Sequence, residues 1–157
     1  MEYKFLNKKE KENILNKIKE QFEIKEIILE ENMVQNKDGK IFLITKDLSK
    51  VNLEKLRINE LGLYIGKDDK ELRLTIEGSQ IFGKNARKNI HEISKEEVKI
   101  WMSGEDIPCD KIYNGFVIVK HKDNFLGTGK YKDNEILNYV PKERWIKQPL
   151  KKLDLTE

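Results

Sequence analysis

The sequence lacks the features on which several large functional classes depend. Its 157 residues include one cysteine, Cys109, so no intramolecular disulfide can form and a reducing compartment is expected. No apolar run approaches the roughly 18 residues of a membrane span, and no charged-then-apolar leader is recognisable, so we expect a cytoplasmic protein. His91 and His121 have no partner at metal-ligand spacing, and we expect neither a metal nor a cofactor.

Signatures of enzyme active sites are missing as well. There is no Ser-His-Asp set, no Gly-x-Ser-x-Gly elbow and no glycine-rich dinucleotide or methyl-donor fingerprint. Residues 127–130, Gly-Thr-Gly-Lys, are too short for a phosphate loop and precede a strand, so they predict a bulge or tight bend. Glu105 and Asp106 would permit acid–base chemistry, but a structural turn is the preferred interpretation. The sequence predicts a protein that is not an enzyme.

Charge is abundant but nearly balanced. Thirty-one lysine and arginine residues offset 28 aspartate and glutamate residues, for a net charge of +3. The balance is uneven along the chain: residues 1–76 contain 16 basic and 15 acidic residues, whereas residues 111–152 contain 10 and 4. A local excess of positive charge is the expected footprint of phosphate binding. For any single exposed lysine, simple solvation is the commoner explanation.

The first half has the pattern of a small α+β domain, which we place at residues 1–83. Asn7 with Glu10 three residues later is a capping box, and apolar residues then recur at helical spacing as far as Phe22. The later elements are short and separated by turn residues: a strand at 24–29, a turn at 36–39, its paired strand at 40–44, a short helix or irregular piece at 47–56, a hairpin of 62–66 with 72–76, and a helical turn at 77–82.

The second half predicts a small barrel-like sheet closed at one end by a helix. Ser94 and Glu97 form a second capping box, and Trp101 lies on the apolar face of the helix that follows. Short apolar strands are expected at 116–119, 125–131 and 136–140. The crossing segment 84–89 is too short for a flexible linker, so the two halves should share an interface. We place this domain at residues 84–147, followed by a polar tail at 148–157.

Two groups of basic residues are candidates for phosphate contact. Lys84, Arg87 and Lys88 would share one face if their segment were helical, and a phosphate clamp and a solvated linker explain them equally well. The second group lies at strand ends around the expected turn at 122–124: Lys120, Lys122, Lys130 and Lys132. RNA contact is the favoured interpretation there, because the excess of positive charge is local.

Three aromatic residues are candidate platforms on which unpaired bases could stack: Tyr131, Tyr139 and Trp145. Aromatic side chains in small barrels are more often part of the core. Core packing is the preferred interpretation of Trp101, and a structural role that of Cys109.

The helix and strands of the second half carry a specific pattern. Residues 94–107 give the capped helix with its Gly-Glu-Asp-Ile turn. Residues 115–142 contain a Val-Ile-Val-Lys strand, then Leu-Gly-Thr-Gly, then Asn-Tyr-Val-Pro-Lys. This pattern, over residues 84–146, resembles a PUA domain, the RNA-binding module named after pseudouridine synthase and archaeosine transglycosylase. It is most similar to the PUA tail of the Nol1/Nop2/Sun RNA cytosine methyltransferases. The length and the preceding α+β unit also resemble the small two-domain PUA factors of ribosome biogenesis.

The resemblance implies a pseudobarrel that binds structured RNA through its helix, the glycine loop after it and a nearby strand. In this sequence these are residues 99–106, residues 120–122 and the strand near Lys142, with Arg144 beside it. The loop Gly104-Glu105-Asp106 departs from that role because carboxylates repel phosphate. RNA at this loop would have to meet backbone amides; otherwise the carboxylates face a protein partner.

The preferred hypothesis is a non-catalytic protein that binds structured RNA, either rRNA precursor or tRNA, as an accessory factor in ribosome biogenesis or RNA modification. A methyltransferase or ribosome-assembly protein would be its protein partner, through the first domain, and no membrane is involved. The expected RNA contacts are Lys84, Arg87, Lys88, Lys99, Lys120, Lys122, Lys130, Tyr131, Lys132, Lys142 and Arg144. Two alternatives stay open: a protein-interaction subunit whose barrel binds no RNA, and the specificity subunit of a split RNA-modifying enzyme.

Overall fold

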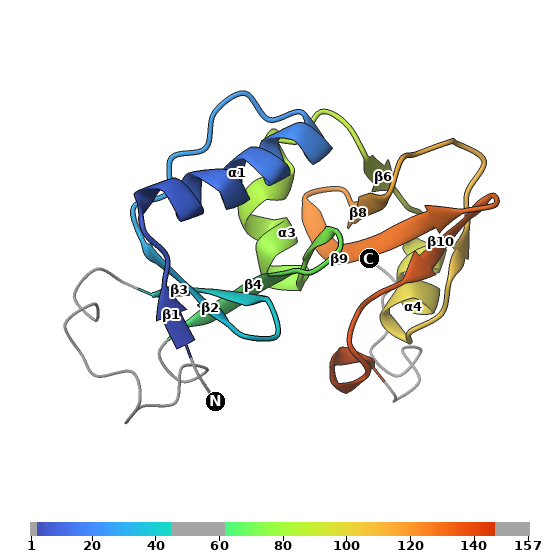
Figure 1. The fold of residues 1–157 in the computed structure, drawn as a ribbon. Coiled ribbons are helices and arrows are strands. Elements are labelled where there is room, and N and C mark those ends of the chain that lie inside the picture. Colours follow the sequence, from blue (N-terminus) through green and yellow to red (C-terminus); the bar gives the residue numbers. More distant parts are fainter. Residues whose placement is uncertain (1–2, 45–61, 147–157) are drawn as a thin grey trace.

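Two five-stranded sheets form the framework of the computed structural model, which describes residues 3–44 and 62–146 (Figure 1). The first sheet is an antiparallel meander of Tyr3–Phe5 (β1), Asn32–Asn36 (β2), Lys40–Ile44 (β3), Leu63–Asp68 (β4) and Leu72–Leu74 (β5). The second has the order Ile90–Glu92 (β6), Phe116–His121 (β8), Asn124–Lys132 (β9), Glu135–Asn138 (β10) and Ile107–Pro108 (β7). The mixed α+β class is therefore confirmed.

The first helix, Lys8–Phe22 (α1), forms as the capping pattern predicts. The Asn7 side chain accepts a hydrogen bond from the backbone N–H of Glu10, and the Glu10 carboxylate accepts one from the Asn7 N–H. These bonds satisfy two of the free donors at the helix start. The apolar stripe of α1 is buried, with Ile18 fully inaccessible, and α1 lies along one face of the first sheet (Figure 1).

The expected strand at 24–29 was wrong. Ile24 is buried and Ile27 and Leu29 pack against the core, but their backbone is irregular and the sheet position is filled by β2. Helix α1 ends at Glu23, whose backbone is in the left-handed region. The β-branched residues that follow pack against the core without forming a strand, so burial outweighs strand propensity here. The turn at 36–39 and strand β3 are as expected. The segment predicted at 47–56 lies outside the described residues, as does the polar tail at 148–157.

The second sheet curls around the helix Lys95–Met102 (α4). Ser94 and Glu97 form the predicted capping box, and Trp101 is fully buried, with its indole N–H donating to the Leu126 carbonyl at 2.9 Å. The pairing of β8 with β9 shifts register between Ile118 and Lys120, which is the bend that the glycines of β9 predict. Strand β9 continues past these glycines to Lys132, and the next element is the strand β10.

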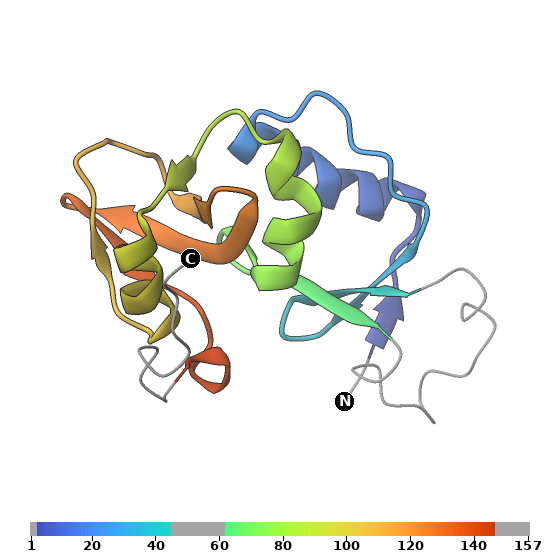
Figure 2. The ribbon, with the colours of Figure 1, turned by 180° about the vertical axis from the view of Figure 1, so that it is seen from behind.

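The helix Ile76–Phe82 (α3) joins the two halves. It lies between α1 and β9 in both views of the ribbon (Figures 1 and 2). Two buried hydroxyls fix the contact: Thr128 Oγ1 donates to the Leu74 carbonyl at 2.8 Å, and Ser79 Oγ accepts from the Gly127 N–H at 3.0 Å. Barrel residues Ile118 and Phe125 belong to the same core cluster as the buried face of α1. The expected interface between the halves is confirmed.

Candidate nucleic-acid interface

The three cations of the crossing segment are exposed but do not lie on a helix. Lys84 is in the short 3-10 helix Gly83–Asn85 (η3), and the chain is irregular at Arg87 and Lys88. The shared helical face was therefore not formed. The backbone is nevertheless fixed, because the N–H groups of Arg87 and Lys88 both donate to the Phe22 carbonyl. No ion pair to these three side chains occurs within the described residues.

The lysines of β8 and β9 fall into two places rather than one. Lys120 and Lys122 lie at the β8–β9 turn, with the Lys120 ammonium 4.0 Å from Glu92 and above the Phe125 ring. Lys130 and Lys132 lie at the opposite end of β9, so the expected single group around the turn was wrong. The reason is geometric: β9 is a nine-residue strand, and its two ends are far apart.

The remaining predicted contacts are spread around the barrel. Lys99 is exposed on α4, and the acidic loop behind it is structural, because Asp106 Oδ1 accepts the Asn138 N–H at 2.7 Å. Tyr131 is half-buried and edge-on to Tyr113, with ring centroids 6.2 Å apart. Lys142 and Arg144 are exposed in the 3-10 helix Lys142–Arg144 (η4). The Arg144 guanidinium is held 3.0 Å from Glu77 and lowers the pKa of that carboxyl, against the opposing effect of burial.

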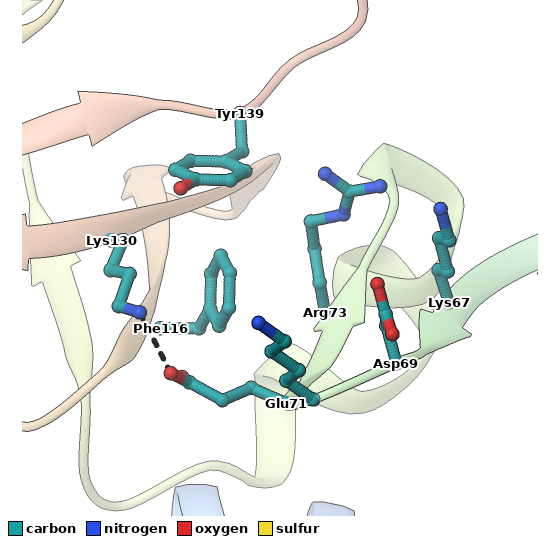
Figure 3. Close-up of a pocket in the computed structure, with 8 residues that line it drawn as sticks. Lys67, Asp69, Glu71, Arg73, Phe116, Lys130 and Tyr139 are labelled. Atoms are coloured by element: carbon teal, nitrogen blue, oxygen red, sulfur yellow. Dashed lines mark hydrogen bonds and ion pairs between the residues drawn. The ribbon is translucent and has the colours of Figure 1, made fainter. Parts of the chain in front are cut away.

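A pocket of about 220 Å³ lies where the β4–β5 hairpin meets the barrel (Figure 3). Its lining combines two aromatic rings, four cations and two carboxylates: Phe116, Tyr139, Lys67, Lys70, Arg73, Lys130, Asp69 and Glu71. The rings meet edge to face with centroids 5.0 Å apart, and Tyr139 is 36% exposed. The Arg73 guanidinium lies 5.6 Å from the Tyr139 ring centre.

The charges in this pocket are only partly neutralised. Lys130 Nζ lies 2.7 Å from Glu71, and this hydrogen bond raises the pKa of Lys130 (Figure 3). Within the described residues, no carboxylate forms an ion pair with Lys67, Lys70 or Arg73. One carboxylate of the lining, Asp69, has no cation paired with it there either. Among the described residues, the pocket cations that form no ion pair therefore outnumber the carboxylates that form none.

The sequence reasoning missed most of this pocket. It named Lys130 and Tyr139 as separate candidates, gave the hairpin of 62–66 with 72–76 no functional role, and did not single out Lys67, Lys70 or Arg73. Strand alternation does place Arg73 on the face opposite Leu72 and Leu74. No local signal indicates that the barrel would cover that face.

His91 gives a testable pH dependence. Its ring is buried, with Nδ1 2.9 Å from the Tyr113 hydroxyl, and burial lowers its pKa. The unfolded chain then binds more protons than the folded one below the ordinary histidine pKa of about 6.5, so stability must fall as pH falls through that range. We expect urea unfolding between about pH 7 and about pH 5 to show a shallower loss for His91→Gln than for the unchanged protein. An identical slope would contradict a buried neutral His91.

Among the described residues no His, Cys, Asp or Glu cluster suited to a metal ion occurs.

Comparison with known proteins bears directly on the barrel. A family model described as the methyltransferase RsmF PUA domain matches residues 88–146. Residues 88–146 form a PUA domain of the RsmF type. The resemblance inferred from the helix and strands is confirmed. The curled sheet, against which α4 packs through Trp101, fits the pseudobarrel expected of such a domain.

The curated relatives extend the likeness beyond the PUA domain. The ribosomal RNA small subunit methyltransferase F of Aeromonas hydrophila is 32% identical over 91 residues, which are 57% of this chain and 19% of that protein. The enzymes of the same name from Vibrio campbellii and Vibrio parahaemolyticus are 28% and 26% identical, over 86% and 87% of this chain. The chain spans 19% to 30% of the length of these relatives. No helix among residues 3–44 and 62–146 is long and apolar enough to cross a membrane.

Proposed function

We propose that this chain binds structured RNA through its PUA domain and acts without catalysis of its own, as an accessory factor in ribosome biogenesis or RNA modification. The observation that carries the proposal is the PUA match over residues 88–146, in a protein otherwise similar to enzymes named for ribosomal RNA. The matched model describes the PUA part of a methyltransferase, which is why we assign binding and not chemistry to this chain.

The surface chemistry supports the same proposal. Lys84, Arg87 and Lys88 are exposed cations on a fixed backbone, with no carboxylate paired to them in the described part of the chain. Such cations contribute affinity that is independent of RNA sequence and sensitive to salt. We place the first domain at residues 1–83 and the PUA domain at residues 84–147, with rRNA precursor or tRNA as ligand and the cytoplasm as location.

A second candidate is the specificity part of an RNA-modifying enzyme whose catalytic part is another chain or segment. The observation that favours it is the likeness to the Vibrio methyltransferases over 86% and 87% of this chain, which includes the first domain. In that case the chain would form a stable complex with a methyltransferase. A pull-down of this chain with such an enzyme separates the two candidates. Recovery of the enzyme in stoichiometric amount would support the specificity part, and its absence would support the independent accessory factor.

Filter binding against tRNA and rRNA fragments at two salt concentrations tests the proposal. We expect binding that weakens steeply as salt rises. For double-stranded segments, the logarithm of the association constant should fall by about 0.9 per phosphate contact for each tenfold rise in salt concentration. A folded RNA should bind better than a scrambled competitor. Absence of binding even at low salt would overturn the RNA-binding proposal and leave the protein-interaction subunit as the working hypothesis.

A further inference from the structure

We propose that the pocket between the β4–β5 hairpin and the barrel is a binding site for one unstacked nucleotide of single-stranded RNA. Its base would stack on the exposed part of the Tyr139 ring, with the buried Phe116 ring as the wall behind it, and the adjoining phosphates would bind Lys67, Lys70 and Arg73. This inference rests on the proposed RNA binding but goes beyond it. It places a recognition site outside the barrel loops, at the contact between the two halves, and so gives the first domain a direct part in RNA binding.

The lining of the pocket combines aromatic rings with cations. An aromatic ring offers a stacking surface to any base, because every base has a π-face. Phe116 is nearly buried at 7% exposure and forms the inner wall, whereas Tyr139 is 36% exposed at the rim (Figure 3). Unpaired cations beside such rings suit a ligand that is flat and apolar at one end and anionic at the other, which describes a nucleotide. An acidic peptide would use the cations but not the rings.

The pocket is small. The pocket volume of about 220 Å³ is below the roughly 300–1,000 Å³ typical of sites for drug-sized ligands. It can therefore accept a single flipped base but not a larger folded ligand. RNA recognition commonly uses bases splayed out of loops and bulges in this way.

Both halves of the chain contribute side chains to the pocket. Lys67 lies in β4, Lys70 in the turn and Arg73 in β5. Phe116, Lys130 and Tyr139 belong to the PUA side. The site exists only because the halves are packed together by α3 and by the bond from Thr128 to the Leu74 carbonyl. Lys130, already a predicted RNA contact, connects the pocket with the barrel surface.

Two carboxylates oppose an anionic ligand and must be accounted for. Glu71 is neutralised by Lys130 at 2.7 Å, and Asp69 is exposed, where water screens its charge. Three cations without an ion pair in the described residues still outnumber it. The arrangement predicts that removing the Glu71 charge strengthens binding, because Lys130 is then free to bind phosphate.

The test is fluorescence anisotropy with two probes, a labelled uridine dodecamer and a blunt RNA duplex with the same number of phosphates. For the dodecamer we expect Tyr139→Ala to weaken binding at least about fivefold, since base–aromatic stacking is worth about 1–3 kcal/mol per base. Tyr139→Phe should bind as the unchanged protein does. Duplex binding should be the same in all three proteins, because a paired base cannot enter the pocket.

A charge-matched pair of double variants covers the possibility that Tyr139→Ala disturbs the fold. Lys67→Ala with Lys70→Ala should lower the salt slope for the dodecamer by about 1.4, at about 0.7 per single-strand phosphate contact. Lys9→Ala with Lys25→Ala removes the same charge from exposed positions outside the pocket and should change little. Glu71→Gln should bind the dodecamer several-fold more tightly.

The outcomes separate this inference from the proposed function. If duplex and dodecamer both bind but no pocket variant differs from its control, the nucleotide pocket is wrong and RNA binding by the PUA domain stands. Equal losses in the two double variants would attribute the effect to net charge and also overturn the pocket. If the unchanged protein binds neither probe nor any folded RNA, both proposals are wrong.

Discussion

Replacing Lys84, Arg87 and Lys88 by glutamate is expected to weaken binding of folded RNA at least about a hundredfold at about 0.1 M salt. Each phosphate contact to a duplex segment adds about 0.9 to the slope of log affinity against log salt. At about 0.1 M salt, relative to 1 M, each contact therefore contributes about 0.9 powers of ten to the affinity. Three lost contacts therefore remove more than two powers of ten, and the new carboxylates add repulsion. The salt slope should fall by about 3.

These three substitutions should leave the fold unchanged. All three side chains are exposed, and the backbone hydrogen bonds to the Phe22 carbonyl do not involve them. The buried Asn89, whose side chain donates to the Gln21 carbonyl at 2.7 Å, continues to hold the crossing segment in place. Stability should change by less than about 0.5 kcal/mol, as for surface positions generally.

The matched control reverses three exposed cations of the first half instead: Lys8, Lys9 and Lys25. It changes the net charge by the same amount but touches no predicted RNA contact. An equal loss of affinity in both triple variants would show that net charge, and not position, governs binding. Unchanged affinity in the crossing-segment variant would remove that segment from the interface.

What could be predicted from the sequence was local in origin. Both capping boxes are set by residues three apart, and both formed as expected, at Asn7 and at Ser94. The burial of Trp101 follows from its place on an apolar helical face. The resemblance to a PUA domain likewise depends on contiguous stretches of helix, turn and strand.

What could not be predicted depends on partners distant in sequence. The run 24–29 has the composition of a strand, but another segment fills the sheet position. Lys130 looks like a free cation until the fold brings Glu71 to within 2.7 Å of it. The pocket requires the β4–β5 hairpin to meet Phe116 and Tyr139, and nothing near any of these residues in the sequence signals that meeting.

Trp101→Ala should lower the free energy of unfolding by about 3–5 kcal/mol, the range for deleting a buried large aromatic. The indole is fully inaccessible and packs against Gly129, where an added Cβ would come within 2.7 Å of the ring. The variant also leaves the Leu126 carbonyl without the hydrogen bond that the indole N–H donates at 2.9 Å. A loss of this size is a large part of a typical total of about 5–15 kcal/mol.

Urea unfolding followed by circular dichroism gives the measurement, and two variants give the comparison. Trp101→Phe keeps a ring but removes the N–H donor, so it should fall between the unchanged protein and Trp101→Ala. Trp145→Ala, at a half-buried position on the rim, should cost less than Trp101→Ala. A loss below about 1 kcal/mol for Trp101→Ala would contradict a packed barrel core.

The same experiment tests whether the two halves unfold together. Ile118 of β8 belongs to one core cluster with Ile18 and Phe22 of α1. Trp101 packs in the neighbouring cluster with Val117 and Val119 of the same strand, so we expect damage at Trp101 to reach the first half through β8. We expect one cooperative transition whose midpoint shifts to lower urea without a change in slope. Two separate transitions would mean that the shared core contributes little and that each half is stable alone. The nucleotide pocket would then lack a fixed geometry, because Lys67, Lys70 and Arg73 come from the first half and the two rings come from the barrel.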